Sequence, residues 1–269
     1  MKDVKFVASD MDKTLLESNS KLPAGIDDII NNLMKLDINF GIASGRPIYT
    51  LQDLFPELKN EMTFICDNGG LVSYKGKILF KSLIDVPDYQ RMVHFVEDDT
   101  DGVPIICALD AAYVNKKYEK YVPFLKTFYT KVELVDDLRT IQRDANKFTI
   151  YFPNGHSQKY YDDIFEPEFG DNFSVVVSGE VWIDIMNKGI DKGGAIRLIG
   201  NYLDIDPSKM MAFGDTFNDK EMLQAVKYSY LMANGSEGME QYANYRTGTN
   251  DEHGVLQVLN KLIEEVSDN

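Results

Sequence analysis

The sequence of 269 residues contains little cysteine and no long apolar run. Its two cysteines, Cys66 and Cys107, both lie within short apolar segments, as buried thiols of a reducing compartment do, so a disulfide framework is not expected. No stretch approaches the ~18 apolar residues of a membrane span, and the first apolar segment, 4–8, is too short for the core of a signal peptide. These features predict a soluble, cytoplasmic protein that does not bind a membrane.

Positive charge and histidine are also scarce. Lysine and arginine number 28 against 43 aspartates and glutamates, which gives a formal net charge of −15. Such a surface repels a phosphate backbone, so nucleic acid is not an expected partner. The three histidines are far apart and lack metal-ligand spacing, so no histidine metal centre is predicted. A phosphorylated small molecule would bind only where a metal ion or local cations reverse the field.

Both ends of the chain alternate short buried strands with amphipathic helices. Strands are predicted at 4–8, 38–43, 63–66, 210–213 and 228–232. Helices are predicted at 24–36, 48–55, 192–203, 219–226 and about 255–266. This alternation is typical of βαβ units, so we expect an α/β fold with a Rossmann-like parallel sheet.

The middle third of the chain has a different, α+β pattern. Strands are predicted at 103–108, 148–152, 173–177 and 181–186, and tyrosine-rich helices at 117–129 and 157–165. Ser178-Gly179-Glu180 indicates a hairpin turn within an antiparallel sheet. We therefore expect a discontinuous α/β core, 1–82 and 188–269, interrupted by an inserted α+β domain at 83–187.

Polar side chains follow several of the predicted core strands. Asp10 and Asp12 come directly after the first strand, and Ser44 and Gly45 end the second. Ligands of an open parallel sheet bind beyond the carboxyl ends of its strands, where these side chains would lie. Two acids one residue apart are, by themselves, more often a solvated turn, so the interpretation depends on the other strand ends.

Those other strand ends supply further acids and a lysine. Asp215, Asn218 and Asp219 follow the strand at 210–213, and Lys192 begins a predicted helix. The helix dipole disfavours a lysine in the first turn unless an anion is bound there. Carboxylate oxygens suit Mg²⁺, which usually takes one or two carboxylates together with phosphate oxygens and water. The set is therefore suited to binding Mg²⁺ and phosphate together.

With these residues in place, the sequence resembles the haloacid dehalogenase superfamily, and specifically its Cof-type phosphatases with an inserted α/β cap. Four motifs occur in the family order: Asp10-x-Asp12-x-Thr14, Ser44-Gly45-Arg46, Lys192 within Asp-Lys-Gly-Gly, and Gly214-Asp215-x-x-Asn218-Asp219. The turn Asn68-Gly69 is also similar to that of the subfamily. Each motif is weak alone, but the four in order, covering essentially the whole chain, are a strong signal.

The resemblance implies a Mg²⁺-dependent phosphatase that acts on a small phosphorylated metabolite through an aspartyl-phosphate. Asp10 would be the nucleophile and Asp12 the general acid and base, with Lys192 as a third catalytic residue. The inserted domain would close over the site, exclude water and contact the leaving group. Sugar phosphates, pyridoxal phosphate and flavin-pathway intermediates are all substrates that the resemblance allows.

The resemblance also implies a metal site and a phosphate site. The metal would be held by the carboxylates of Asp10 and Asp215 and the backbone carbonyl of Asp12. Asp219 would orient metal-bound water, or serve only as a first-turn acid of its helix. The phosphoryl oxygens would be held by residues from three of the motifs, namely Ser44, Gly45, Lys192 and Asn218.

Lys13 departs from the pattern, because family members of this type usually have glycine there. If that position requires a positive φ, lysine costs on the order of 1 kcal/mol. Two other functions remain open at this point: a phosphomutase or phosphotransferase on the same scaffold, and a non-catalytic phosphometabolite-binding protein. The sequence carries no indication of oligomeric state.

Overall fold

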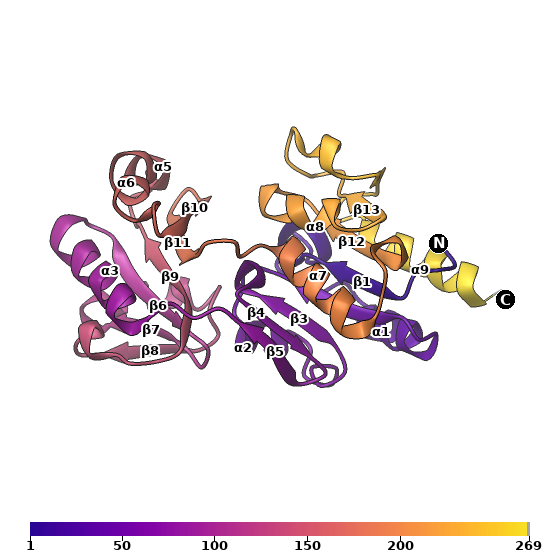
Figure 1. Cartoon of the computed structure of the whole chain (residues 1–269), viewed down its shortest axis with the longest axis horizontal. Coiled ribbons are helices and arrows are strands. Elements are labelled where there is room, and N and C mark those ends of the chain that lie inside the picture. The colour runs from indigo at the N-terminus through magenta and orange to yellow at the C-terminus, as the bar shows by residue number, and fades with distance from the viewer. Residues whose placement is uncertain (268–269) are drawn as a thin grey trace. The chain divides into compact units, whose positions relative to one another are not determined.

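The computed structural model describes residues 1–267, which separate into two compact units (Figure 1). The first unit contains residues 1–45, 54–79 and those from Asp191 onward. The second contains residues 46–53 and 80–190. Because the first unit is built from both ends of the chain, the N-terminal ammonium lies 2.7 Å from the carboxylate of Glu265 in the last helix.

The first unit is organised around an eight-stranded sheet in the order β14-β13-β12-β1-β2-β3-β4-β5. Neighbours from β14 to β3 pair in parallel, and β4 runs antiparallel to β3. The strands are β1 (Phe6–Ser9), β2 (Asn39–Ala43), β3 (Thr63–Cys66), β4 (Leu71–Tyr74), β5 (Lys77–Lys81), β12 (Met210–Gly214), β13 (Tyr228–Leu231) and β14 (Tyr245–Arg246). The expected Rossmann-like α/β fold with a parallel-dominated sheet is confirmed.

The α-helices of the first unit pack in two pairs. They are α1 (Ile26–Lys35), α7 (Lys192–Leu203), α8 (Lys220–Gln224) and α9 (Gly254–Ser267). α1 packs on α9 and on β2, while α7 packs on α8, which contacts β12. The buried side chains of α1 follow the helical repeat, with Ile26, Ile29, Ile30 and Leu33 turned to the core. β1, whose four residues are all buried, lies between β12 and β2 near the middle of the sheet.

The second unit has a six-stranded sheet in the order β10-β11-β9-β6-β7-β8. All pairs are antiparallel except β7 with β8. The strands are β6 (Val103–Ala108), β7 (Ala112–Asn115), β8 (Val132–Val135), β9 (Ala145–Tyr151), β10 (Phe173–Gly179) and β11 (Trp182–Asn187). The helices are α2 (Ile48–Leu54), α3 (Val86–Asp99), α4 (Val122–Leu125), α5 (Ser157–Tyr160) and α6 (Glu166–Phe169). Side chains from α3, α6 and the sheet, such as Tyr89, Phe148 and Phe169, form one apolar cluster.

The helix predicted at 117–129 is wrong in length and type. The structure has a 3₁₀ segment at Lys116–Tyr121 followed by the single turn of α4. Pro123 lies at the start of α4. Proline has no N–H for the preceding turn and its ring clashes with that turn, so a continuous helix through this position is unfavourable.

Several elements were not predicted, and some of them carry local signals in the sequence. α3 carries buried residues at a helical spacing, Tyr89, Met92, Val93 and Val96, after a proline in its first turn. The β4–β5 hairpin turns at Lys75-Gly76, where both residues have positive φ, 47° and 75°. That conformation is typical of a two-residue hairpin turn. β7, β8 and β14 are short strands whose pairing depends on neighbours distant in sequence.

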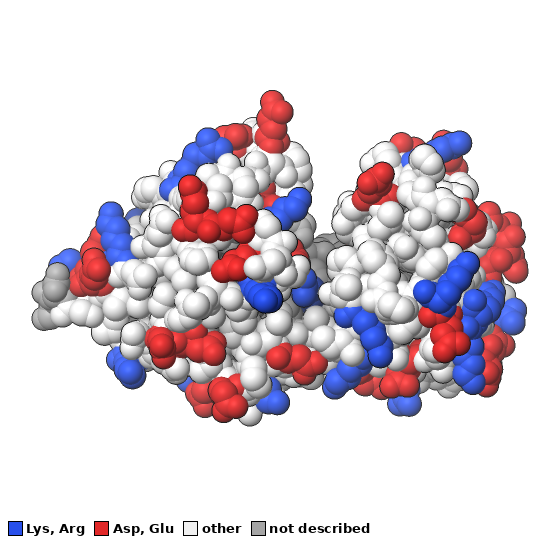
Figure 2. Space-filling model, turned by 180° about the vertical axis from the view of Figure 1, so that it is seen from behind, with Lys and Arg blue, Asp and Glu red and all other residues white. Residues whose placement is uncertain are grey.

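The surface carries charges of both signs. On the face drawn in Figure 2, lysines and arginines are interspersed with aspartates and glutamates. Across residues 1–267, no helix has both the length and the apolar character needed to cross a membrane.

Substitution of the two adjacent glycines in α7, Gly193 and Gly194, tests how closely this helix packs. A Cβ at Gly193 would lie 2.4 Å from the carbonyl oxygen of Glu221 in α8, whereas a Cβ at Gly194 would meet its nearest atom at 3.6 Å. We expect Gly193→Ala to lower the free energy of unfolding by about 1–3 kcal/mol through overpacking. Gly194→Ala, the matched control, should be neutral or raise it by up to ~1 kcal/mol, because alanine favours helix. Urea unfolding of both variants measures this; equal midpoints would contradict the close contact.

Candidate active site

The carboxyl ends of three neighbouring strands bring the predicted site residues into one region. Ser9 at the end of β1 pairs with Phe213 of β12, so Asp10 lies beside the start of the loop that carries Asp215. The backbone N–H of Asp10 donates to the carbonyl oxygen of Phe213 at 3.0 Å. Ser44 follows β2 on the other side of β1 and is buried. The strand order therefore gathers residues that are far apart in the chain.

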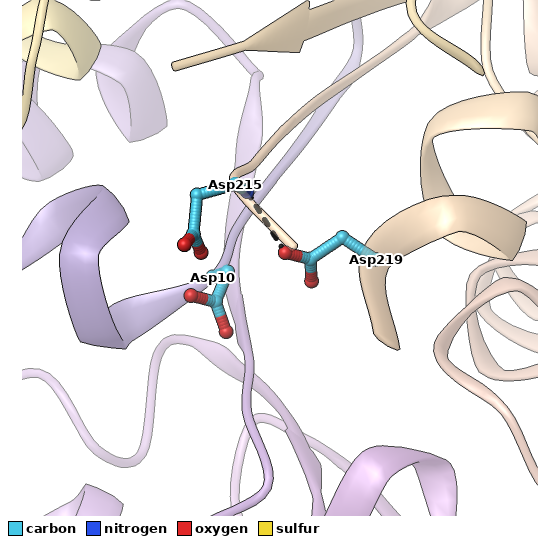
Figure 3. Close-up of side chains that lie close together, drawn as sticks. All are labelled: Asp10, Asp215 and Asp219. Carbon is cyan, nitrogen blue, oxygen red and sulfur yellow. Dashed lines mark hydrogen bonds between the residues drawn. The ribbon is translucent and has the colours of Figure 1, made fainter. Parts of the chain in front are cut away.

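Three buried carboxylates converge at this point (Figure 3). Asp10, Asp215 and Asp219 each offer an oxygen within 4.8 Å of the others. Asp219 is fixed by its Oδ2 atom, which accepts from the backbone N–H of Asp215 at 3.0 Å. The hydroxyl of Thr14 donates to Oδ1 of Asp215 at 3.2 Å. These hydrogen bonds hold two of the three carboxylates in defined orientations.

Lys192 is the cation of this cluster and is completely buried. Its Nζ lies 2.7 Å from Oδ1 of Asp10 and 2.6 Å from Oδ1 of Asp219. The residue begins α7, whose N-cap is Asp191, with its carboxylate accepting from the backbone N–H of Gly194 at 2.7 Å. A lysine at a helix start is disfavoured by the dipole, but here two acids within hydrogen-bond distance compensate.

Burial and mutual repulsion change the proton affinities of these groups. Burial, together with the nearby carboxylates of Asp219 and Asp215, raises the pKa of Asp10 well above its usual range, although Lys192 opposes the shift. Burial and Asp219 raise the pKa of Asp215 to about 6. Burial alone would lower the pKa of Lys192, but the carboxylates of Asp10 and Asp219 outweigh it and raise that pKa. Lys192 therefore keeps its ammonium charged, while the raised pKa values of Asp10 and Asp215 show that burial and repulsion disfavour their negative charges.

The charge balance of the cluster fits a divalent cation. Three carboxylates and one ammonium sum to −3 + 1 = −2 when all are ionised. Such a surplus in a buried site requires a compensating cation or protonation. The donors are hard oxygen atoms, which suit Mg²⁺ and similar ions. Asp10 and Asp215 are the carboxylates best placed to hold it, since both oxygens of Asp219 already accept hydrogen bonds.

The remaining predicted site residues come from the same sequence motifs, but they differ from the buried cluster in their exposure to solvent. The side chain of Asp12 is exposed, and the following Lys13 has φ 61°. The carbonyl oxygen of Lys13 accepts from Nδ2 of Asn234 at 2.8 Å, which holds the turn in this conformation. Lys13 thus occupies a positive-φ position, the condition under which lysine there is costly.

Asn218 is exposed, and its Nδ2 donates to Oδ1 of Asn68 at 3.1 Å. Gly45 also lies against Asn68, because a Cβ at Gly45 would be 3.4 Å from both polar atoms of its amide. Neither Asn68 nor Thr14 was assigned a role from the sequence. The Asn68-Gly69 turn was visible as a motif, whereas no sequence signal indicates which partners its side chain contacts.

Known proteins resemble this chain in sequence and in fold. Residues 7–259 match the profile of the haloacid dehalogenase-like hydrolases. The 5-amino-6-(5-phospho-D-ribitylamino)uracil phosphatase YbjI of Escherichia coli is 29% identical over 263 residues, covering 97% of each chain. The solved structure of SMU.1108c from Streptococcus mutans has a TM-score of 0.88 and 30% identity, covering 97% of this chain and 99% of that one. A haloacid dehalogenase-like hydrolase from Bacteroides thetaiotaomicron, 19% identical, shares the fold with a TM-score of 0.86 over 96% of this chain and 99% of its own.

The chain belongs to the haloacid dehalogenase-like hydrolases, and it is a phosphatase of that family. The family is one that generally uses a divalent metal ion, in agreement with the charge of the aspartate cluster. The sequence-based expectations of the family, the fold class and the enzyme class are therefore confirmed.

The buried lysine gives a prediction about stability. Lys192→Met removes the only ammonium that bonds Asp10 and Asp219 within residues 1–267 and leaves buried carboxylates uncompensated. We expect the free energy of unfolding, measured in urea with EDTA present, to fall by about 3–5 kcal/mol. Lys59→Met, at an exposed position, should change it by less than ~0.5 kcal/mol. A Lys192→Met protein as stable as Lys59→Met would show that the ion pairs do not hold the site together.

Proposed function

We propose that the protein is a Mg²⁺-dependent phosphomonoester hydrolase that transfers the phosphoryl group of a small metabolite to Asp10 and then to water. The observation that carries the proposal is the buried cluster of Asp10, Asp215 and Asp219 with Lys192 at the carboxyl ends of the parallel strands. An acidic protein of net charge −15 binds a phosphate ester only where positive charge is concentrated, and Lys192 together with a Mg²⁺ ion held by the acids would provide it here.

In the first step, a carboxylate oxygen of Asp10 attacks phosphorus in line with the leaving group. The new bond joins Asp10 to phosphorus, the ester P–O bond breaks, and its electron pair goes to the departing oxygen. Asp12 donates a proton to that oxygen, so the product leaves as an alcohol. The exposed side chain of Asp12, two residues from Asp10, suits a group that exchanges protons with substrate and solvent.

In the second step, water cleaves the aspartyl-phosphate. Asp12, now ionised, takes a proton from the water as its oxygen attacks phosphorus. The bond between phosphorus and Asp10 breaks, which releases inorganic phosphate and restores the carboxylate. The same two residues therefore serve both steps, with Asp12 alternating between acid and base.

The phosphoryl oxygens are held by groups from three different loops. Lys192 supplies a fixed ammonium, Ser44 a hydroxyl at the end of β2, and Asn218 an amide after β12. Mg²⁺, when held by Asp10, Asp215 and the Asp12 carbonyl, supplies positive charge that offsets repulsion between the acids and the phosphate. Positioning and charge neutralisation provide most of the catalysis in phosphoryl transfer.

The substrate class follows from the relatives and is part of the proposal. YbjI, by its name, acts on a phosphorylated ribitylaminouracil, and its similarity extends over 97% of both chains. We infer a small phosphorylated metabolite, with flavin-pathway phosphates as the first candidates and sugar phosphates and pyridoxal phosphate beside them.

Replacing the nucleophile tests the covalent mechanism. Asp10→Asn should lower kcat on the order of 10³-fold or more and form no phosphoenzyme, because an amide does not attack phosphorus. Asp12→Asn should lower kcat by roughly 10²–10⁴-fold and, with p-nitrophenyl phosphate, whose leaving group needs no proton, accumulate phosphoenzyme because water is no longer activated. Acid-quenched reactions with ³²P-labelled substrate measure both. Asp27→Asn, which changes an exposed acid in α1, should behave as wild type; turnover by Asp10→Asn near the wild-type rate would overturn the nucleophile assignment.

Metal removal and product analysis test the reaction class. Phosphate release from p-nitrophenyl phosphate and from a panel of phosphorylated metabolites should require Mg²⁺ and stop in EDTA, returning when Mg²⁺ is restored. Undiminished release in EDTA would contradict the metal requirement. An isomeric phosphate with little free phosphate among the products would instead indicate a phosphomutase.

A further inference from the structure

The loop that follows β3 has an unusual backbone. Asp67, Asn68 and Gly69 have φ values of 48°, 54° and 105° in succession. Left-handed conformations of this kind disfavour residues other than glycine, although asparagine and aspartate tolerate them better than most. Such a conformation persists only where the surrounding structure determines it, and such segments occur often at functional sites.

This loop contacts two of the catalytic motifs through its backbone. The N–H of Asn68 donates to the carbonyl oxygen of Ser44 at 3.0 Å. A Cβ at Gly69 would lie 2.5 Å from the carbonyl oxygen of Asp191, the N-cap of the helix that begins with Lys192. The loop therefore packs between the end of β2 and the start of α7.

The side chain of Asn68 reaches a third motif. Its Oδ1 accepts a hydrogen bond from Nδ2 of Asn218 at 3.1 Å. The amide of Asn68 also lies beside Gly45, where a Cβ would be 3.4 Å from it, an ordinary van der Waals distance. Asn218 is exposed to solvent. In the part of the chain that the structure describes, the hydrogen bond to Asn68 restricts the rotation of the Asn218 amide.

A primary amide carries two hydrogens in one plane, so a bond to the first sets the direction of the second. We propose that Asn68 is a positioning residue: it holds the Asn218 amide by one hydrogen so that the other is directed at a phosphoryl oxygen of the substrate. This inference rests on the proposed phosphate contact of Asn218. It adds a residue, Asn68, that acts through Asn218 and does not touch the reacting atoms.

Asn68→Gly removes the acceptor and keeps the backbone, because glycine adopts φ 54° without strain. Loss of one such hydrogen bond should lower kcat/KM roughly 3- to 10-fold and raise the inhibition constant of inorganic phosphate by a similar factor. Asp37→Gly is the matched control, since Asp37 is exposed, has φ 57° and lies between α1 and β2. It should leave both constants within about twofold of wild type.

The decisive measurement is a double-mutant cycle with Asn218→Ala. If Asn68 acts through Asn218, Asn68→Gly should change kcat/KM and the phosphate inhibition constant by less than about twofold in the Asn218→Ala background. An equal loss in both backgrounds, or no loss in the wild-type background, would overturn the inference. Should Asn68→Gly fail to fold, Asn68→Ala enters the same cycle, where backbone strain is common to both backgrounds and cancels.

The same series separates this inference from the proposed function. Wild-type constants in Asn218→Ala, with Asp10→Asn inactive, would overturn the role of Asn218 and with it that of Asn68, while the aspartyl chemistry would stand. Full activity in Asp10→Asn would overturn the proposed function itself, whatever the result of the cycle.

Discussion

The structure of the site depends on one buried ammonium. Lys192 bonds Asp10 and Asp219 at 2.7 and 2.6 Å and has no solvent exposure. An unpaired charge at such a position is costly, so the lysine and the carboxylates must come together as the chain folds. These ion pairs connect three segments of the chain: the residues that follow β1, the loop after β12 and the first turn of α7. The position of α7 is in turn set by the N-cap Asp191 and by the close packing of Gly193 on α8.

The parallel sheet determines which loops share the site. β1 lies between β12 and β2, so residues that follow these three strands lie at one edge. The loop at Asp67–Gly70, after β3, extends the same edge to Ser44 and to Asp191. The loops that form the site therefore contact one another through their backbones. These contacts hold the charged groups in place.

Much of the fold could be predicted because its signals are local. The strand at 63–66 and the helix at 192–203 have the predicted limits, since apolar runs and helical spacing are properties of neighbouring residues. The helix predicted at 117–129 was wrong for a local reason. Pro123 interrupts it, and the prediction followed the apolar periodicity of the segment without regard to this proline. β14, with two residues, could not be predicted, because its pairing with β13 is decided by a partner distant in the chain.

The sequence by itself determined which chemical groups stand at the strand ends, and hence the family, the enzyme class and the suitability for a divalent cation. Only the tertiary structure decided how these groups meet. The contact of Lys192 with Asp10 spans 182 positions, and that of Asn218 with Asn68 spans 150. Burial, which raises the pKa of Asp10, exists only after the sheet and α7 have packed. These distances and this desolvation exist only in the folded protein. They depend on which strands are neighbours in the sheet, and not on which residues are neighbours in the sequence.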